Sequence, residues 1–147
     1  MAGIYIHIPF CRKLCSYCDF YHVISQSDNK QYIDALNREA YLRRDYLGNQ
    51  TVSTIYIGGG TPSVLQPSEI KSILDNLGRN FRVDEEPEVT IELNPDDVTE
   101  EFLEGLKKTI VRGLNDSYAT LKKTNVSPHI SMARINPEYK MPGFVFI

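Results

Sequence analysis

The chain has 147 residues and a mass of 16.8 kDa, which suits one ordinary domain with a real hydrophobic core. Hydrophobic residues make up 41% and charged residues 24%, a globular balance that excludes a disordered chain. The formal net charge of −3 gives no electrostatic reason to expect a nucleic-acid partner, and no stretch approaches the roughly 20 apolar residues of a membrane span.

Apolar runs predict three strands, and amphipathic periodicity predicts a helix after each of them. In chain order we expect a strand over 2–8, a helix over 28–47 with Asp28 as its N-cap, a strand over 52–57, a helix over 67–81, a charged connection over 82–88, a strand over 89–93 and a short helix capped by Thr99. This alternation predicts the α/β class, with parallel β/α units and right-handed crossovers. Polar motifs follow the strand ends, where such folds place their sites.

From about residue 110 the pattern weakens, because proline and glycine interrupt it repeatedly. Only 116–123 suggests a further short helix. We therefore divide the chain into an N-terminal part, 1–109, and a divergent or truncated tail, 110–147, that we expect to be irregular.

The cysteines form one motif. Cys11, Cys15 and Cys18 are the only three in the chain and follow a C-x3-C-x2-C spacing. Thiolates are the usual ligands of iron–sulfur clusters, and three of them leave one iron of a [4Fe–4S] cluster open to a small molecule. Arg12 and Lys13, inside the loop, can offset the negative charge of such a cluster.

The spacing alone also fits other chemistry. A zinc site with His22 or His7 as fourth ligand is one alternative, and a Cys15–Cys18 redox pair is another. An odd number of clustered cysteines argues against a disulfide framework and fits a reducing compartment. Because the N-terminus also lacks the pattern of a secretory signal, we expect a cytoplasmic protein.

Two further motifs follow strands. Gly58-Gly59-Gly60-Thr61-Pro62 comes after the second predicted strand, and glycines without a Cβ let the backbone approach a ligand closely. A plain tight turn is the alternative. Glu92 lies near the end of the third predicted strand, where its carboxylate can accept hydrogen bonds from a ligand or simply face solvent.

The cysteine motif after a first strand resembles the radical S-adenosylmethionine (SAM) superfamily. The flanking residues 4–10 and Asp19-Phe20-Tyr21 resemble the oxygen-independent coproporphyrinogen III oxidase family. Phe20 stands where the oxidase branch carries a further cysteine, so the sequence is more similar to the heme-chaperone branch. The resemblance covers about residues 2–108, and the fourth-strand pattern of relatives is not found beyond them.

This resemblance implies the first three β/α units of a partial (β/α)6 TIM-like barrel. It implies a [4Fe–4S] cluster on Cys11, Cys15 and Cys18, with SAM on the open iron. The implied SAM-binding residues are Tyr5, Gly58, Gly59, Gly60, Thr61 and Glu92.

In relatives the reduced cluster cleaves SAM to methionine and a 5′-deoxyadenosyl radical. Heme or porphyrin is the further partner that the family implies, with an electron donor of the flavodoxin or ferredoxin class. Because oxidase activity is not expected of the chaperone branch, the resemblance leaves open whether the chain is an enzyme. A zinc- or redox-active cysteine module, and a remnant that binds nothing stably, stay as alternatives.

Overall fold

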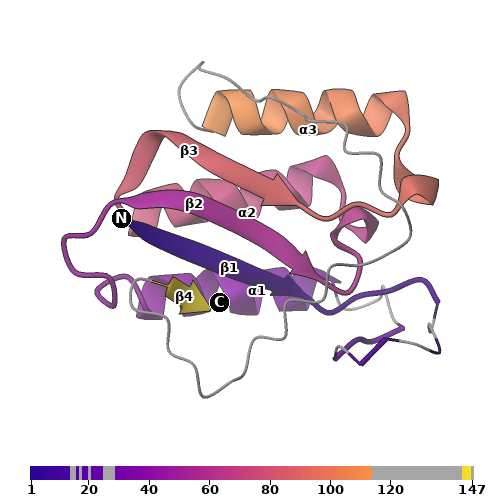
Figure 1. Cartoon of the computed structure of the whole chain (residues 1–147), viewed down its shortest axis with the longest axis horizontal. Helices are drawn as coiled ribbons and strands as arrows, with labels where there is room; N and C mark the ends of the chain where they lie inside the picture. The colour runs from indigo at the N-terminus through magenta and orange to yellow at the C-terminus, as the bar shows by residue number, and fades with distance from the viewer. Residues whose placement is uncertain (14–15, 17, 20, 25–28, 114–143, 147) are drawn as a thin grey trace.

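The computed structural model describes residues 1–13, 16, 18–19, 21–24, 29–113 and 144–146. Within them, parallel strands form one sheet in the order β3-β2-β1-β4 (Figure 1). The strands are β1 (Ala2–Ile8), β2 (Val52–Gly59), β3 (Val83–Ile91) and β4 (Phe144–Phe146). The helices are α1 (Asn29–Leu42), α2 (Pro67–Asn80) and α3 (Glu100–Gly113), each following one of the first three strands. The expected α/β class and its three parallel β/α units are confirmed.

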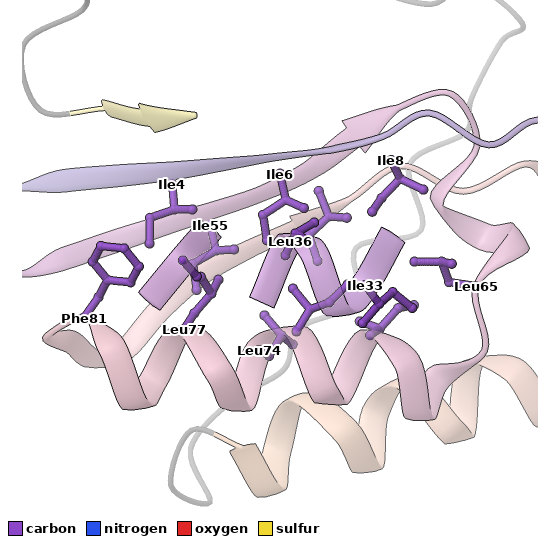
Figure 2. Close-up of a cluster of buried hydrophobic side chains, with 14 of the residues drawn as sticks. Ile4, Ile6, Ile8, Ile33, Leu36, Ile55, Leu65, Leu74, Leu77 and Phe81 are labelled. Carbon is purple, nitrogen blue, oxygen red and sulfur yellow. The ribbon is translucent and has the colours of Figure 1, made fainter. Parts of the chain in front are cut away.

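The hydrophobic core lies between the sheet and α1 and α2, and α3 packs beside α2. Alternate residues of β1 and β2 point into this core, as Figure 2 shows for Ile4, Ile6 and Ile8. From the helices the core receives Ile33, Leu36, Ile70, Ile73, Leu74 and Leu77. Because these strands alternate, their remaining side chains lie on the other face of the sheet.

Helix α2 follows its sequence signals. Pro67 occupies the first turn, where a missing N–H costs nothing, and the Glu69 carboxylate accepts a hydrogen bond from the Gln66 amide at 2.7 Å. The predicted apolar series ends at Phe81, which is buried just after the last helical residue. The helix was therefore predicted correctly to within a residue.

Helix α1 is shorter than predicted. Its expected N-cap, Asp28, lies outside the described residues, and the helix ends at Leu42 instead of Leu47. Continuing the buried series of Ile33, Leu36 and Ala40 by one turn leads to two arginines at 43 and 44, which cannot enter the core. The chain leaves the helix there and reaches the core again through Leu47.

Strand β3 begins earlier and ends earlier than predicted. The charged segment 82–88 was expected to be a connection, but Val83 pairs with Val52, and the pairing resumes at Glu88 after an irregularity. Asp84, Glu85 and Glu86 are exposed on this strand, where charges discourage pairing with other chains. The strand ends at Ile91, so Glu92 follows it directly.

The C-terminal part differs from the prediction in two ways. Helix α3, capped as expected by the Thr99 hydroxyl, which accepts from the Phe102 amide at 3.1 Å, is not short and continues to Gly113. The tail was expected to be irregular, yet Phe144–Phe146 forms β4 and pairs with Gly3–Tyr5 of β1. The helix expected over 116–123 lies outside the described residues, and the domain division near 109 stays a prediction.

In the part of the chain that the structure describes, no helix has both the length and the apolar composition needed to cross a membrane.

Candidate functional site

The candidate site lies at the carboxyl ends of β1, β2 and β3, which point the same way (Figure 1). Three segments leave the sheet there. They are the cysteine loop after β1, the glycine segment 58–61, which begins with the last two residues of β2, and the turn after β3 that contains the short 3-10 helix η2 (Pro95–Asp97). Parallel strands bring these segments together although they are about 85 residues apart between Arg12 and Asp97, as sheets of this class generally do.

The base of the cysteine loop is closed by backbone hydrogen bonds. The Cys11 amide donates to the Val23 carbonyl at 3.0 Å, and the Val23 amide donates to the Pro9 carbonyl at 2.7 Å. The Tyr32 hydroxyl of α1 donates to the His7 carbonyl at 2.5 Å, just before the loop. Cys11 and Cys18 are free and partly accessible, whereas Cys15, Tyr17 and Phe20 lie outside the described residues.

The glycine segment contacts the cysteine loop directly. The Gly60 amide donates to the Ile8 carbonyl and the Thr61 amide to the Phe10 carbonyl, both at 2.7 Å. The Thr61 hydroxyl donates to the sulfur of Cys11 at 3.4 Å. Hydrogen bonds to a ligating sulfur are one of the ways in which a protein tunes a metal centre.

The sequence predicted that all three glycines follow the second strand, but only Gly60 does so. Gly58 and Gly59 are the last residues of β2 and pair with His7 and Ile8 of β1. A Cβ on Gly59, whose φ is +112°, would lie 2.6 Å from the His7 ring, and one on Gly60 would lie 2.7 Å from the Phe10 carbonyl oxygen. The glycines therefore allow close approach within the chain itself, in addition to any approach by a ligand.

Glu92 points toward the glycine segment. One carboxylate oxygen accepts a hydrogen bond from the Tyr56 hydroxyl at 2.5 Å, and the other accepts from the Gly59 amide at 3.2 Å. The Glu92 backbone is anchored as well, because its amide donates to the Ile57 carbonyl at 3.0 Å. The structure thus brings Glu92 together with two of the predicted glycines.

Tyr5 joins the same group of side chains. Its ring stacks on that of Tyr56, with centroids 5.9 Å apart, and its hydroxyl lies 3.1 Å from Nδ1 of His7. The His7 Nε2 lies 3.2 Å from the Tyr21 carbonyl, which can only accept, so Nε2 carries the proton and Nδ1 accepts from Tyr5. Both ring nitrogens of His7 therefore have partners within the chain.

Both tyrosines are held in the neutral form. Burial, followed by the negative charge of Glu92, raises the pKa of Tyr5 to about 12. Burial, followed by the hydrogen bond to Glu92, raises the pKa of Tyr56 well above its usual value. At neutral pH the two hydroxyls are therefore hydrogen-bond donors, and Tyr56 fixes the position of the Glu92 carboxylate.

Sequence reasoning missed three contributors, Tyr56, Ser63 and Asp97. Tyr56 lay inside the strand predicted over 52–57, and Asp97 lay between the strand predicted over 89–93 and the helix capped by Thr99, so neither was given a role. Asp97 is buried and accepts from the Ser63 hydroxyl at 2.8 Å, and it pairs with Arg12 at 2.9 Å. The only signal in the sequence was the pair of adjacent carboxylates, Asp96 and Asp97, after a predicted strand. Such a pair does not by itself show which carboxylate is buried and which is solvated.

Among the described residues, no group of three or more His, Cys, Asp or Glu side chains is arranged to hold a metal ion. Of the three predicted cysteine ligands, Cys15 lies outside the described residues.

Comparison with known proteins adds to this geometry. The sequence matches the Radical SAM superfamily over residues 5–139. It is 36% identical to the heme chaperone HemW of Bacillus subtilis over 124 residues, which cover 83% of this chain and 33% of that protein. It is 34% identical to the oxygen-independent coproporphyrinogen III oxidase of Escherichia coli over 107 residues, or 71% of this chain and 23% of that one.

Among solved structures, the chain resembles coproporphyrinogen III oxidase (HemN) from Escherichia coli, which is described as a radical SAM enzyme. The TM-score is 0.67 with 28% sequence identity, over 80% of this chain and 31% of that one.

Together, the parallel β/α units and these matches define the class: the chain belongs to the radical SAM superfamily. Within it, the relatives include HemW and oxygen-independent coproporphyrinogen III oxidase, and the fold is the start of a radical SAM TIM-like barrel. The superfamily match runs to residue 139, beyond residue 108 where the sequence resemblance was expected to end. The chain spans about a quarter to a third of the length of the curated relatives it matches.

Proposed function

We propose that this chain provides the part of a radical SAM protein that holds the cluster and SAM, with Cys11, Cys15 and Cys18 as ligands of a [4Fe–4S] cluster. The observation that carries the proposal is the hydrogen bond from Thr61 to the Cys11 sulfur, which joins the cysteine loop to the glycine segment. Three cysteine ligands, one of which accepts a hydrogen bond from the Thr61 hydroxyl outside the cysteine loop, suit a cluster with one open iron. When bound and reduced, such a cluster supplies the electron that cleaves the sulfonium bond of SAM.

The remaining site residues would orient SAM. Glu92, fixed by Tyr56 and the Gly59 amide, would accept hydrogen bonds from the amino group or ribose hydroxyls of SAM. The backbone of Gly58, Gly59, Gly60 and Thr61 would lie along the amino acid part of SAM, and Tyr5 would line the same face of the sheet. The protein's share is to bind and orient, since the bond cleavage belongs to the cofactors.

We further propose that the whole protein works with heme or porphyrin, as the names of its relatives suggest, and as a heme chaperone more than as an oxidase. Phe20 in place of a fourth nearby cysteine supports the chaperone branch, because all three cysteines of the chain are already in the triad. A cytoplasmic location, an electron donor of the flavodoxin or ferredoxin class, and the division at residue 109 belong to the same proposal.

Anaerobic reconstitution of the full chain tests the cluster assignment. We expect about four irons and about four sulfides per chain, and a loss of most of this iron in each of C11S, C15S and C18S. His22→Gln is the matched control, because it removes a ligand of the alternative zinc site without touching a thiol. One zinc and no sulfide per chain, lost in H22Q, would establish the zinc module instead.

Hemin titration of the reconstituted chain tests the second part. Hemin binding without any conversion of coproporphyrinogen III would support the chaperone branch, whereas conversion would support the oxidase branch.

A further inference from the structure

A chain of polar contacts joins all three segments at the candidate site. Arg12 of the cysteine loop pairs with Asp97 of η2, with Nη2 and Oδ1 2.9 Å apart. The other oxygen of Asp97 accepts from the hydroxyl of Ser63, which follows the glycine segment, at 2.8 Å. Ser63 in turn accepts from the Asn94 amide at 3.0 Å, so the hydroxyl is used in both directions. These contacts connect the ends of β1, β2 and β3 in one network.

The burial of the two charges is unequal. The side chain of Asp97 is only 3% exposed, whereas that of Arg12 is 57% exposed. A carboxylate so far out of water is tolerated because both of its oxygens have strong partners, and removing one partner leaves a buried charge uncompensated. Arg12, in contrast, has water available and gives up mobility when it stays on Asp97. The surrounding protein therefore fixes the position of Asp97, and the Asp97 carboxylate in turn restrains Arg12.

Holding Arg12 also restrains Cys11, its neighbour in the chain. Cys11 is restrained from a second side by Thr61, two residues before Ser63. The same segment thus contacts the cysteine sulfur through Thr61 and the Asp97 carboxylate through Ser63. Arg12 is engaged with a buried carboxylate, so its main contribution is the placement of the loop and not a free positive charge near the cluster.

We propose that Arg12 and Asp97 are positioning residues that fix the cysteine loop against the connections after β2 and β3. The inference rests on the proposed function, since the loop is held in place for the cluster that it carries. Neither residue touches the cluster or SAM in this account. Both act through the position of Cys11.

The first test uses the chain without a cluster. Hydrogen–deuterium exchange is compared for the Cys11 and Val23 amides, which close the base of the loop. D97N and R12Q should each speed their exchange by about threefold or more, while the amides of β2 keep their rates. The matched controls are D96N and K13Q, which remove the adjacent exposed charges. Because Arg12 is mostly exposed, R12Q removes the pair without opening the core.

A double-mutant cycle shows whether the two residues act through each other. R12Q leaves the Asp97 carboxylate buried without its cation, and D97N removes that buried charge. The Cys11 and Val23 amides of R12Q/D97N should therefore exchange no faster than those of R12Q alone. Rates that multiply in the double variant would mean that the residues act independently. That result, or D97N and R12Q exchanging like D96N and K13Q, would overturn the proposal.

The second test uses the reconstituted chain. Iron release to a chelator should be about threefold to tenfold faster in D97N and R12Q than in the wild type and the two controls. If the wild type binds no cluster, the proposed function fails, but the exchange experiment still decides whether the pair holds the loop. If exchange changes and iron release does not, the pair is structural only and the positioning role is overturned.

Discussion

The two faces of the sheet differ sharply although the same strands build them. On the helix-covered face, β1 places Ile4, Ile6 and Ile8, each fully buried (Figure 2). On the other face the same strand places Tyr5 and His7, which are hydrogen-bonded to each other. A period of two along one strand thus separates residues that hold the fold from residues that form the site.

This difference has an energetic side. The helix-covered face is stabilised by the removal of apolar area from water, which is worth about 1.5–3 kcal/mol for each buried aliphatic side chain. The other face is held by hydrogen bonds, whose net contribution is about 1 kcal/mol each. Changes on the first face should therefore act on folding, and changes on the second should act mainly on ligand binding.

The largest effect is expected on the helix-covered face. Ile6→Ala removes a fully buried side chain from the centre of the sheet and should lower the free energy of unfolding by about 2–5 kcal/mol. Urea-induced unfolding followed by circular dichroism measures it. A loss below about 1 kcal/mol would mean that the two faces do not differ in the way described.

The next largest effect is expected at Gly60, where the glycine segment lies against the start of the cysteine loop. In Gly60→Ala the new Cβ would meet backbone oxygen atoms of Ile8 and Phe10, which cannot turn away. We expect a loss of stability of about 1–3 kcal/mol, together with loss of cluster uptake.

Gly78→Ala is the matched control for this change. Gly78 lies in α2, and no other atom lies within 4 Å of the place that an alanine methyl group would take, so alanine should stabilise the chain by about 0.5–1 kcal/mol. If G60A is as well tolerated as G78A, the close contact between the glycine segment and the cysteine loop is not as described.

A smaller effect on folding, but a clear one on binding, is expected for Tyr56→Phe. The ring stays stacked on Tyr5, and only the hydrogen bond to Glu92 is lost, so the stability change should stay within about 1 kcal/mol. The affinity of the reconstituted chain for SAM, measured by equilibrium dialysis, should fall by about threefold to tenfold, because Glu92 is less well fixed. An unchanged affinity for SAM would mean that Tyr56 does not contribute to SAM binding.

The last effect is absent at neutral pH and is confined to alkaline solution. Tyr5 has a pKa raised to about 12 in the folded chain, compared with about 10 in an unfolded one. The folded state therefore keeps a proton that the unfolded state has lost, so this contribution to stability is complete below pH 10 and is lost as the pH rises toward 12. Tyr56 acts in the same direction.

A titration of tyrosinate absorbance, which is free of tryptophan signal because the chain has no Trp, should show a late fraction that becomes smaller in Y5F, while Tyr56 still titrates late. If the absorbance lost in Y5F instead belongs to a tyrosine that titrates near pH 10, the raised pKa of Tyr5 is contradicted.

The contrast between the faces also explains what the sequence could predict. The buried series of α2 and the run of isoleucines in β1 have a strong period, so the elements and the α/β class were predictable. The start of β3 was not, because a strand at the edge of the sheet can carry the exposed charges of Asp84, Glu85 and Glu86 that read as a loop. Strand β4 was missed because its pairing with β1 connects positions about 140 residues apart.

At the site, the motifs were predictable and their partners were not. Thr61, Glu92 and the glycines lie at strand ends, as their positions in the sequence indicated. The roles of Tyr56 and Asp97 could be recognised only in three dimensions, because they depend on which side chains of other segments they contact. The network through Asp97 is the kind of long-range ion pair that no local pattern signals.

The central claim is that the face of the sheet that carries Tyr5 and His7 forms, together with the cysteine loop, one site for a cluster and SAM. The most direct measurement is the electron paramagnetic resonance spectrum of the reduced, reconstituted full chain with and without SAM. The account predicts a cluster signal that changes on addition of SAM, and a higher SAM concentration for the same change in E92Q. A cluster signal that stays the same at saturating SAM would contradict it.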